Sequence, residues 1–261
     1  MGRIVSWFSC GVASAVATKL ALLKAKDNPE FVIAYCELKE EHSDNRRFLE
    51  DCEEWFGQEI IILGNDDYDR STVNVYRKEK YLVGVKGARC TIELKKVVRK
   101  KFQQADDVLV FGYTIEEKHR LKQFQAQNAE GHSVIAPLID LNLSKANCLA
   151  MIHRVGIELP TMYKLGYRNN NCIGCVKGGA GYWNKIRRDF PDRFDEMARI
   201  ERELGRTICK VEGREDGERW LERVYLDELS PDQGDYPNEP DISCGVFCLS
   251  AEQKLKSLER M

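Results

Sequence analysis

The sequence lacks several features that would assign a chain of 261 residues to a familiar class. Its 40 basic residues nearly balance its 42 acidic ones, and the formal net charge of −2 is too small for a tail-like nucleic-acid binder. No run approaches the roughly 18 apolar residues of a membrane-spanning helix, so we expect no membrane partner. Residues 1–8 lead straight into a strand-like run without the long apolar segment of a signal peptide. We therefore expect a cytoplasmic protein.

Cysteine, in contrast, is plentiful, with ten residues in the chain. In a small secreted protein this number would indicate a disulfide framework, but this chain is too large and, at 31% charged residues, too charged for that class. Its 43% of hydrophobic residues are enough to form a core. In a cytoplasmic protein with such a core, thiols favour metal ligation or redox chemistry.

The first part of the chain alternates short apolar runs with helical patterns. Strands are predicted over 4–8, 31–36, 59–63, 108–111 and 134–136, and helices over 13–26, 46–56, 91–104, 116–128 and 145–155. Strands separated by helices favour an α/β fold with a doubly wound, parallel five-stranded sheet. Ligands of such sheets bind beyond the carboxyl ends of the strands, which makes the loops after Phe8, Cys36 and Phe111 candidate sites.

The pattern changes after residue 160, and we predict a division there. Residues 1–160 form the α/β domain, and 161–261 form a cysteine-rich, helical and tail extension that closes the active site. Residues 169–171 and the glycines between 174 and 181 indicate a loop-rich segment of the kind that binds ligands. A helix is expected over 193–204, and the acidic stretch 212–241 is expected to be a mobile tail.

A candidate phosphate-binding turn lies between the first strand and the first helix, at residues 9–14. Its sequence is Ser-Cys-Gly-Val-Ala-Ser. Small residues there let backbone amides approach an anion, and the helix N-terminus adds partial positive charge. The turn has neither the GxxxxGK[ST] of a P-loop nor the GxGxxG of a dinucleotide fold. Close packing without any ligand is the structural alternative.

A second motif is the C-x-x-C formed by Cys172 and Cys175, which is followed by Lys177 and two glycines. This spacing can place two thiolates on one metal ion or cluster, or form a redox dithiol. Further thiols are available at Cys90, Cys244 and Cys248. A C-x-x-C followed later by C-x-x-x-C also fits a structural zinc site.

The order of these motifs resembles that of the phosphoadenosine phosphosulfate (PAPS) reductase-like family, within the PP-loop, or adenine nucleotide alpha hydrolase, superfamily. The loop of the pyrophosphatases is SGGxDS, and Ser9, Gly11 and Ser14 match it. Cys10 stands in place of the second glycine, and Ala13 in place of the aspartate. The resemblance extends over about the first 180 residues and implies a HUP-like fold.

The resemblance also implies a ligand, an adenine nucleotide such as PAPS, adenosine phosphosulfate (APS) or ATP, with Mg²⁺ as a candidate companion. The residues expected to bind the nucleotide are Ser9, Cys10, Gly11, Ser14, Cys36, Gly112, Lys118 and Arg120. Arg89 and Lys95 are expected to bind the phosphate or sulfonate of the substrate.

The family's iron–sulfur members imply roles for the cysteines. In those enzymes a cysteine pair precedes a basic helix, and a C-x-x-C follows about eighty residues later. On this basis we expect a [4Fe–4S] cluster on Cys90, Cys172, Cys175 and Cys248, with zinc as the alternative. Thr91 replaces one member of the pair, and an open iron that binds sulfide is a further alternative.

The tail carries the expected nucleophile. Residues 243–246, Ser-Cys-Gly-Val, resemble the E-C-G-hydrophobic-H motif of the reductases, with Ser in place of Glu and Phe247 in place of His. We therefore expect Cys244 to attack the sulfur of the substrate, although Cys244 and Cys248 could exchange roles.

The main functional expectation is reduction of a sulfonucleotide, with an S-sulfo intermediate on Cys244 that thioredoxin or glutaredoxin releases as sulfite. One alternative is ATP-dependent sulfur transfer to tRNA or DNA, guided by the basic helix from Lys95 to Lys101. Another is a zinc-stabilised, non-catalytic binding module. A homo-oligomer is compatible with each of these.

Several of these residues have structural interpretations as well. The lysines and arginines of 95–101 could form a solvated helix face, and His119 is expected at the surface. Cys36, Cys52, Cys148 and Cys209 fall in strand or helix patterns and are expected to pack in the core, as are Trp7, Tyr182 and Trp183.

Overall fold

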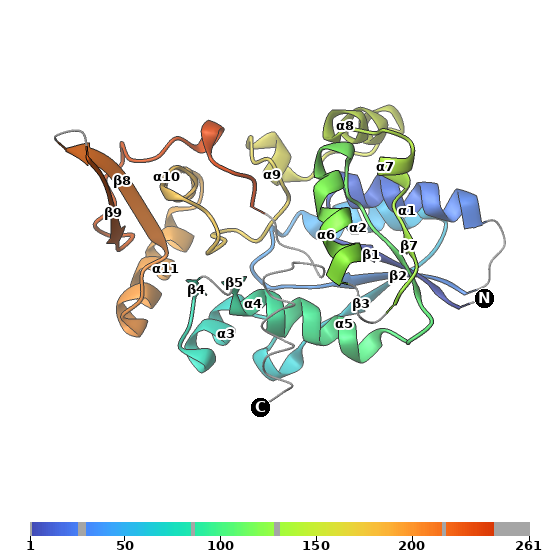
Figure 1. Ribbon diagram of the computed structural model, residues 1–261, viewed down its shortest axis with the longest axis horizontal. Helices are drawn as coiled ribbons and strands as arrows, with labels where there is room; N and C mark the ends of the chain where they lie inside the picture. Colours follow the sequence, from blue (N-terminus) through green and yellow to red (C-terminus); the bar gives the residue numbers. More distant parts are fainter. Residues whose placement is uncertain (1, 26–29, 85–86, 128–130, 216–217, 243–261) are drawn as a thin grey trace.

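A parallel sheet at the centre of the molecule organises the first part of the chain. The computed structural model describes residues 2–25, 30–84, 87–127, 131–215 and 218–242. Five parallel strands lie in the order β3-β2-β1-β6-β7. They are β1 (Ile4–Phe8), β2 (Phe31–Cys36), β3 (Ile60–Leu63), β6 (Val108–Val110) and β7 (Val134–Ile135). The predicted α/β fold with a doubly wound five-stranded sheet is confirmed (Figure 1).

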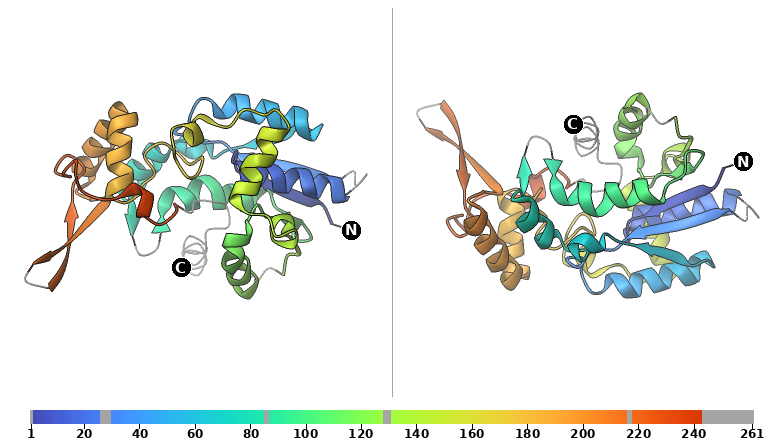
Figure 2. Two further views of the ribbon diagram at one scale, coloured as in Figure 1. Left: turned by 90° about the horizontal axis from the view of Figure 1, so that it is seen from above. Right: turned by 90° about the horizontal axis from the view of Figure 1, so that it is seen from below.

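Helices cover both faces of this sheet. On one face lie α1 (Val12–Ala25), α2 (Asn45–Phe56), α7 (Pro137–Asp140) and α8 (Lys145–Arg154). On the other lie α5 (Val97–Phe102) and α6 (Lys118–Gln127). Alternation along β1 explains the two layers, because Phe8 packs against the α1 side whereas Val5 and Trp7 pack against the α5 side. The views in Figure 2 show the helices on either side of the strands.

A second hydrophobic core lies beyond the carboxyl end of the sheet. It contains α10 (Ala180–Asp189), α11 (Pro191–Leu204) and the antiparallel hairpin of β8 (Cys209–Glu215) and β9 (Glu218–Val224). Two elements from the middle of the chain, α3 (Thr72–Glu79) and α4 (Arg89–Thr91), pack into the same core. Figure 1 shows them between the sheet and the C-terminal helices. This arrangement brings Cys90 to the C-x-x-C segment.

The remaining elements are short. A 3-10 turn, η1 (Asp66–Tyr68), precedes α3, and the small hairpin of β4 (Val83–Gly84) and β5 (Gly87–Ala88) precedes α4. A π-helical segment, η2 (Ile92–Lys96), joins α4 to α5, and η3 (Ile115–Glu117) leads into α6. A single turn, α9 (Thr161–Lys164), and η4 (Tyr236–Asn238) lie in the C-terminal part. In the described part of the chain, no helix has both the length and the hydropathy needed to cross a bilayer.

One expectation about the C-terminal part was wrong, and two helices of the chain were not predicted. The acidic stretch 212–241 is not a mobile tail, because its described residues form most of the β8–β9 hairpin and the η4 turn. Val211 and Leu226 are buried in the second core and attach the hairpin to it. The many charged residues around them made these apolar contacts hard to predict from the sequence. The helices α3 and α10 were also missed, since their glycine-rich or irregular flanks obscured the helical period.

Glu201 joins the two ends of this hairpin to α11. Its carboxylate is 0% exposed and accepts hydrogen bonds from the backbone N–H groups of Ile208 and Leu226, the latter at 2.6 Å. Burial raises the pKa of Glu201 from 4.5 to about 7. The folded state therefore binds a proton that the unfolded state has already released.

This shift predicts a pH dependence of stability. The free energy of unfolding should fall by about 2 kcal/mol as the pH rises from about 5 to about 8, because ionised Glu201 is disfavoured only in the folded state. Glu201→Gln should lower stability but remove that part of the slope. Urea unfolding of both proteins across this range measures it, and equal slopes would contradict the assignment.

Candidate functional site

The predicted phosphate loop follows β1 and leads into α1, as expected. The hydroxyl of Ser14 closes it, accepting from the backbone N–H of Ser9 at 3.1 Å and donating to the carbonyl of Gly11 at 2.9 Å. Cys10 has φ +54°, in the left-handed region that side chains rarely adopt. Its thiol is fully buried, and burial raises its pKa well above the ordinary value. Cys10 therefore offers a ligand its backbone rather than a thiolate.

The loop lies at the point where the strand order reverses. β1 has β2 on one side and β6 on the other, and ligands of doubly wound sheets bind at the carboxyl edge beside such a switch point. Gly112 follows β6 and lies so close to the phosphate loop that a Cβ atom there would be 2.8 Å from the Cα of Ser14. The structure thus brings together the two segments that the sequence assigned to nucleotide binding.

A buried polar network supports the loop from below. Asn170 donates from Nδ2 to the carbonyl of Cys10 at 2.6 Å and to Oδ1 of Asn45 at 2.8 Å. Asn45 in turn donates to the carboxylate of Glu41 at 3.0 Å. The Glu41 side chain is only 5% exposed and its pKa is raised by burial, while Lys95 at 3.9 Å favours the charged form. The sequence did not indicate Asn45 or Glu41, whereas Asn170 belongs to the segment 169–171 that was expected to bind ligands.

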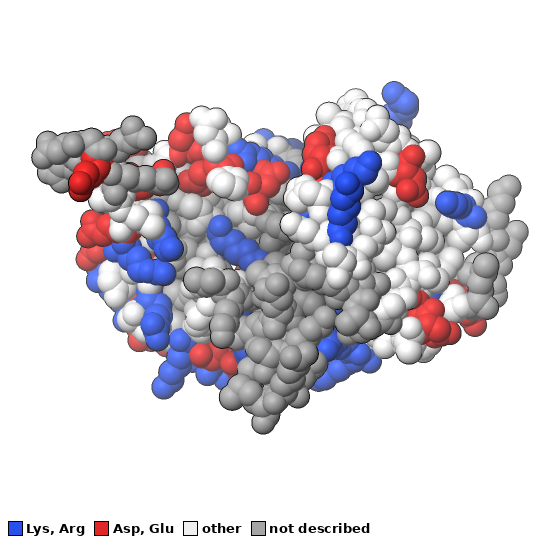
Figure 3. Space-filling view, in the orientation of Figure 1, with Lys and Arg blue, Asp and Glu red and all other residues white. Residues whose placement is uncertain are grey.

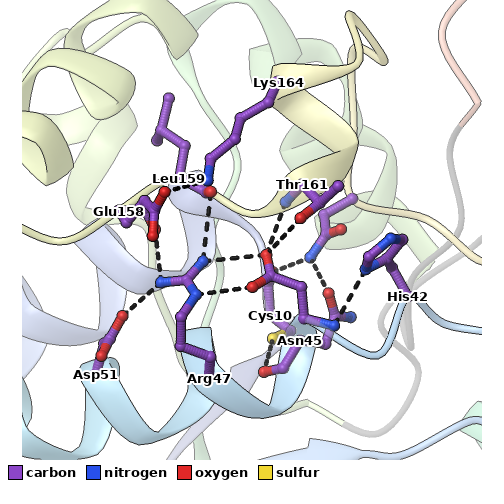
Figure 4. Close-up of polar contacts among 11 residues, drawn as sticks. Cys10, His42, Asn45, Arg47, Asp51, Glu158, Leu159, Thr161 and Lys164 are labelled. Atoms are coloured by element: carbon purple, nitrogen blue, oxygen red, sulfur yellow. Dashed lines mark hydrogen bonds and ion pairs between the residues drawn. The ribbon is translucent and has the colours of Figure 1, made fainter.

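A second set of contacts places α9 over the phosphate loop (Figure 4). Arg47 binds the carboxylate of Asp44 at 2.7 Å and the carbonyl of Glu158 at 3.0 Å. Asp44 also accepts from the backbone N–H of Thr161 at 2.8 Å, and the Arg47 guanidinium lowers its pKa. Asp44 therefore caps α9 rather than α2, where it makes no side-chain capping bond.

Tyr163, on α9, reaches the loop itself. Its hydroxyl accepts from the backbone N–H of Val12 at 3.4 Å. Lys145, the first residue of α8, lies 3.4 Å from the same hydroxyl and donates to Oδ1 of Asn169 at 2.9 Å. The sequence analysis missed both residues, because nothing in their local pattern relates them to residues 9–14.

Three of the predicted metal ligands share one buried site. Cys90, Cys172 and Cys175 are 6%, 8% and 7% exposed and belong to the same hydrophobic core. Gly174, between the two cysteines of the motif, has φ +72°, which allows the tight turn of the C-x-x-C. In the described part of the chain, no three His, Cys, Asp or Glu side chains are arranged to hold a metal ion.

Two tyrosines organise these cysteines. Tyr76 is 2% exposed, and its hydroxyl donates to Sγ of Cys90 at 3.5 Å. Burial, and the negative charge of the three thiols when they are ionised, raise the pKa of this hydroxyl. The hydroxyl of Tyr182 accepts from the backbone N–H of Cys175 at 2.9 Å and donates to the carbonyl of Cys172 at 3.3 Å. One tyrosine thus contacts sulfur, and the other fixes the backbone of the motif.

The predicted basic residues divide into buried and exposed groups. Lys95, Lys96 and Arg99 are 9%, 0% and 2% exposed, so the expected solvated face is wrong for them. Arg89 binds Glu79 and Glu93, at 3.1 and 2.7 Å. Over the described part of the face in Figure 3, acidic and basic side chains are interspersed.

The residues after η3 are more exposed than a nucleotide-binding role predicts. Lys118 is exposed, as is His119, which agrees with the surface position predicted for it. Arg120 binds Glu117 and stacks over the ring of Tyr113 at 4.4 Å. Cys36 is buried at the end of β2, and burial raises its pKa to about 12. Cys36 is thus a packing thiol beside the site.

The chain that leads to the tail is anchored at the cysteine site. The segment 235–242, which we call the strap, is held by Arg168, whose guanidinium donates to the carbonyl of Tyr236 and the carboxylate of Asp241, both at 3.0 Å. Asn171 donates to the carbonyl of Ile242 at 3.1 Å. The predicted nucleophile Cys244 and ligand Cys248 lie outside the described residues.

Comparison with known proteins gives little beyond the fold. No protein-family model matches the chain, and no curated protein matches it either. Among solved structures, it is similar to the U34-tRNA thiolase NcsA from Methanococcus maripaludis with its [4Fe-4S] cluster. The match has 12% sequence identity and a TM-score of 0.40, and it covers 78% of this chain and 72% of the thiolase.

The contact between Gly112 and Ser14 predicts a sharp mutational effect. Gly112→Ala should force the two loops apart, destabilise the fold by about 1–3 kcal/mol and weaken binding of adenine nucleotides. Gly57→Ala is the matched control, because Gly57 has φ +71° with no atom near its Cβ position and ends α2. It should lower stability by about 1–2 kcal/mol and leave nucleotide binding unchanged. Equal nucleotide affinity in both variants, measured by calorimetry, would contradict a nucleotide site at residues 9–14 and Gly112.

Proposed function

We propose that the protein is an adenine-nucleotide-dependent sulfurtransferase that uses ATP to activate an acceptor and transfers sulfur at Cys90, Cys172 and Cys175. The observation that supports the proposal is that these three thiols, from segments far apart in the sequence, are buried in the same hydrophobic core around the hydroxyl of Tyr76. Sulfonucleotide reduction is the rival reaction. Three thiols leave one corner of a [4Fe–4S] cluster available for sulfide, which favours transfer.

The distance between the thiols and the phosphate loop supports one shared active site. Asn170 contacts the carbonyl of Cys10 and precedes Cys172 by only two residues. Two residues of extended chain span at most about 7 Å, so nucleotide and cysteines are neighbours. The nucleotide would lie over residues 9–14, with its phosphates at the N-terminus of α1.

The donors have the chemistry of cluster ligands, although the three sulfurs of the described structure are not arranged around one metal position. The three cysteines are buried among apolar side chains, and Tyr76 supplies a hydrogen bond to one sulfur, as is common around iron–sulfur centres. Cys90, Cys172 and Cys175 would hold the group, and its fourth corner would remain open for sulfide. When bound, the cluster would supply a site for sulfide.

The proposed reaction balances without an external oxidant. A carbonyl oxygen of the acceptor attacks the α-phosphorus of ATP, the bond to the β-phosphate breaks, and pyrophosphate leaves. Hydrosulfide then attacks the activated carbon, forms the C–S bond and displaces AMP, which carries away the oxygen. The protein's own contribution is to hold the nucleotide at residues 9–14 and to exclude water around the buried thiols.

A cleft lies beside the C-x-x-C, at Ile173, although none of the three thiols lines it. It has a volume of about 440 Å³ and runs between residues 39–41 and the turn from α10 to α11, with Ile173 on its wall. Its charged lining is mainly acidic, because Arg193 is paired with Glu196 at 2.6 Å and four further carboxylates, of Glu40, Glu41, Asp189 and Asp192, outnumber Lys39. The cleft therefore favours a neutral or cationic group over the phosphates of a nucleic acid.

The cluster is tested by anaerobic purification. The protein should be brown and contain about four irons per chain. Cys90→Ser and Cys172→Ser should lose the iron, whereas Cys148→Ala, at a packing cysteine that is 0% exposed, should retain it. A colourless protein with one zinc per chain would contradict the cluster.

Product analysis separates the two reactions. ATP should yield pyrophosphate only when an acceptor such as tRNA or DNA is present and AMP only when sulfide is present as well, and the acceptor should gain sulfur. Sulfite release from PAPS or APS, lost in Cys244→Ser, would instead establish reduction. Cys172→Ser should abolish sulfur transfer while leaving ATP binding intact.

The Tyr76 hydrogen bond predicts a shift in potential. Tyr76→Phe removes only the hydroxyl that donates to Cys90, and its loss should lower the reduction potential of the cluster by on the order of 40 mV, the equivalent of about 1 kcal/mol. Tyr182→Phe is the control, because its hydroxyl binds backbone rather than sulfur. A redox titration followed by EPR should show the shift in the first variant only. Equal potentials in the two variants would exclude the role.

A further inference from the structure

The phosphate loop carries no charge of its own. No acidic or basic residue occurs between Arg3 and Lys19, and the two serines of the loop are neutral. A nucleotide with several phosphates carries multiple negative charges, which the amides of a helix N-terminus compensate only in part. A cationic side chain from another element is therefore needed for tight binding.

Lys145 is placed to supply that charge. Its Nζ is 3.4 Å from the hydroxyl of Tyr163, and the backbone N–H of Val12 donates to the same hydroxyl at 3.4 Å. Asn169 and the ring of Tyr163, whose centroid is 5.2 Å from Nζ, hold the ammonium group in position. In the described part of the chain, the Nζ of Lys145 contacts these neutral groups and makes no ion pair with a carboxylate. The carboxylate of Glu116, which accepts from the backbone N–H of Lys145 at 3.4 Å, lies beside it, so the ammonium charge is partly balanced and the remainder is available to an anion.

Asn170 provides an independent indication of a ligand. The residue is 8% exposed, and its Nδ2 is already bound to the carbonyl of Cys10 in the loop. Its Oδ1 is buried and accepts no hydrogen bond. A buried acceptor without a donor is costly, and nucleotides carry suitable donors in their ribose hydroxyls and adenine amino group.

We propose that Lys145 binds the phosphates of the nucleotide, as the cation that the loop itself lacks. The inference rests on the proposed function, because it requires an adenine nucleotide at residues 9–14. Lys145 interacts with the phosphates beyond the sugar. Its contribution therefore grows with their number.

Calorimetric titration with adenosine, AMP and ATP tests this assignment. Lys145→Met should weaken ATP binding by about 10- to 100-fold and AMP binding less, while adenosine binding stays unchanged. Lys145→Arg should recover most of the ATP affinity. Lys164→Met is the matched control, because Lys164 lies on α9 close to the same loop but binds Glu158, and it should behave as the wild type.

The outcomes distinguish the two proposals. If Lys145→Met weakens the binding of adenosine, AMP and ATP equally, Lys145 has a structural role. If the affinity for ATP is unchanged, Lys145 has no role. Either result overturns the inference while the nucleotide site stands. Failure of the wild-type protein to bind ATP, AMP or adenosine would overturn the inference together with the nucleotide-dependent function. Unfolding curves of the variants confirm that each is folded.

Discussion

Three consecutive asparagines, at positions 169–171, form the constraint on which the site depends. Each reaches a different component: Asn169 holds Lys145, Asn170 holds the carbonyl of Cys10, and Asn171 holds the carbonyl of Ile242. Cys172 follows directly. The amide side chain suits this junction because it donates and accepts without adding charge to a buried position. A shift of the phosphate loop would therefore also displace the C-x-x-C and the strap, because the hydrogen bonds of the three asparagines connect these segments.

The sheet could be predicted from the sequence because its signals are local. Apolar runs such as residues 4–8 and 31–36 alternate with helical periods, and all five strands appear within a few residues of their expected bounds. Local signals fail where contacts between residues distant in the sequence determine the structure. The β8–β9 hairpin carries many charges, and only Val211, Leu226 and the carboxylate of Glu201 reveal how it is anchored. In the sequence, nothing distinguishes Glu201 from a surface glutamate.

The candidate site was predictable only in its motifs. Residues 9–14, Gly112 and the three cysteines stand out by residue type and spacing, and the fold brings them to one end of the sheet. The residues that support them do not stand out. Tyr76 and Lys145 act through side chains that cross between elements, and such contacts leave no periodic pattern in the sequence. Asn170 lies in a segment that was expected to bind ligands, but its contact with Cys10 did not follow from the sequence. The buried Lys95, Lys96 and Arg99 show the converse error, since a basic helical stretch was expected to include a solvated face.

The left-handed Cys10 shows how the loop combines strain with rigidity. A non-glycine residue at φ +54° costs about 1–2 kcal/mol. Here the thiol is fully buried and donates to the carbonyl of Asn45 at 3.4 Å, and Asn170 binds the Cys10 carbonyl, so burial and two hydrogen bonds offset the strain. Glycine would relieve the strain but would also remove the buried contacts and make the turn more flexible. A loop fixed in this way orients its amides before a ligand arrives. Because its residues include no cation, the nucleotide site that we propose depends on Lys145 of α8 for charge and on Tyr163 of α9, which contacts both the loop and that lysine.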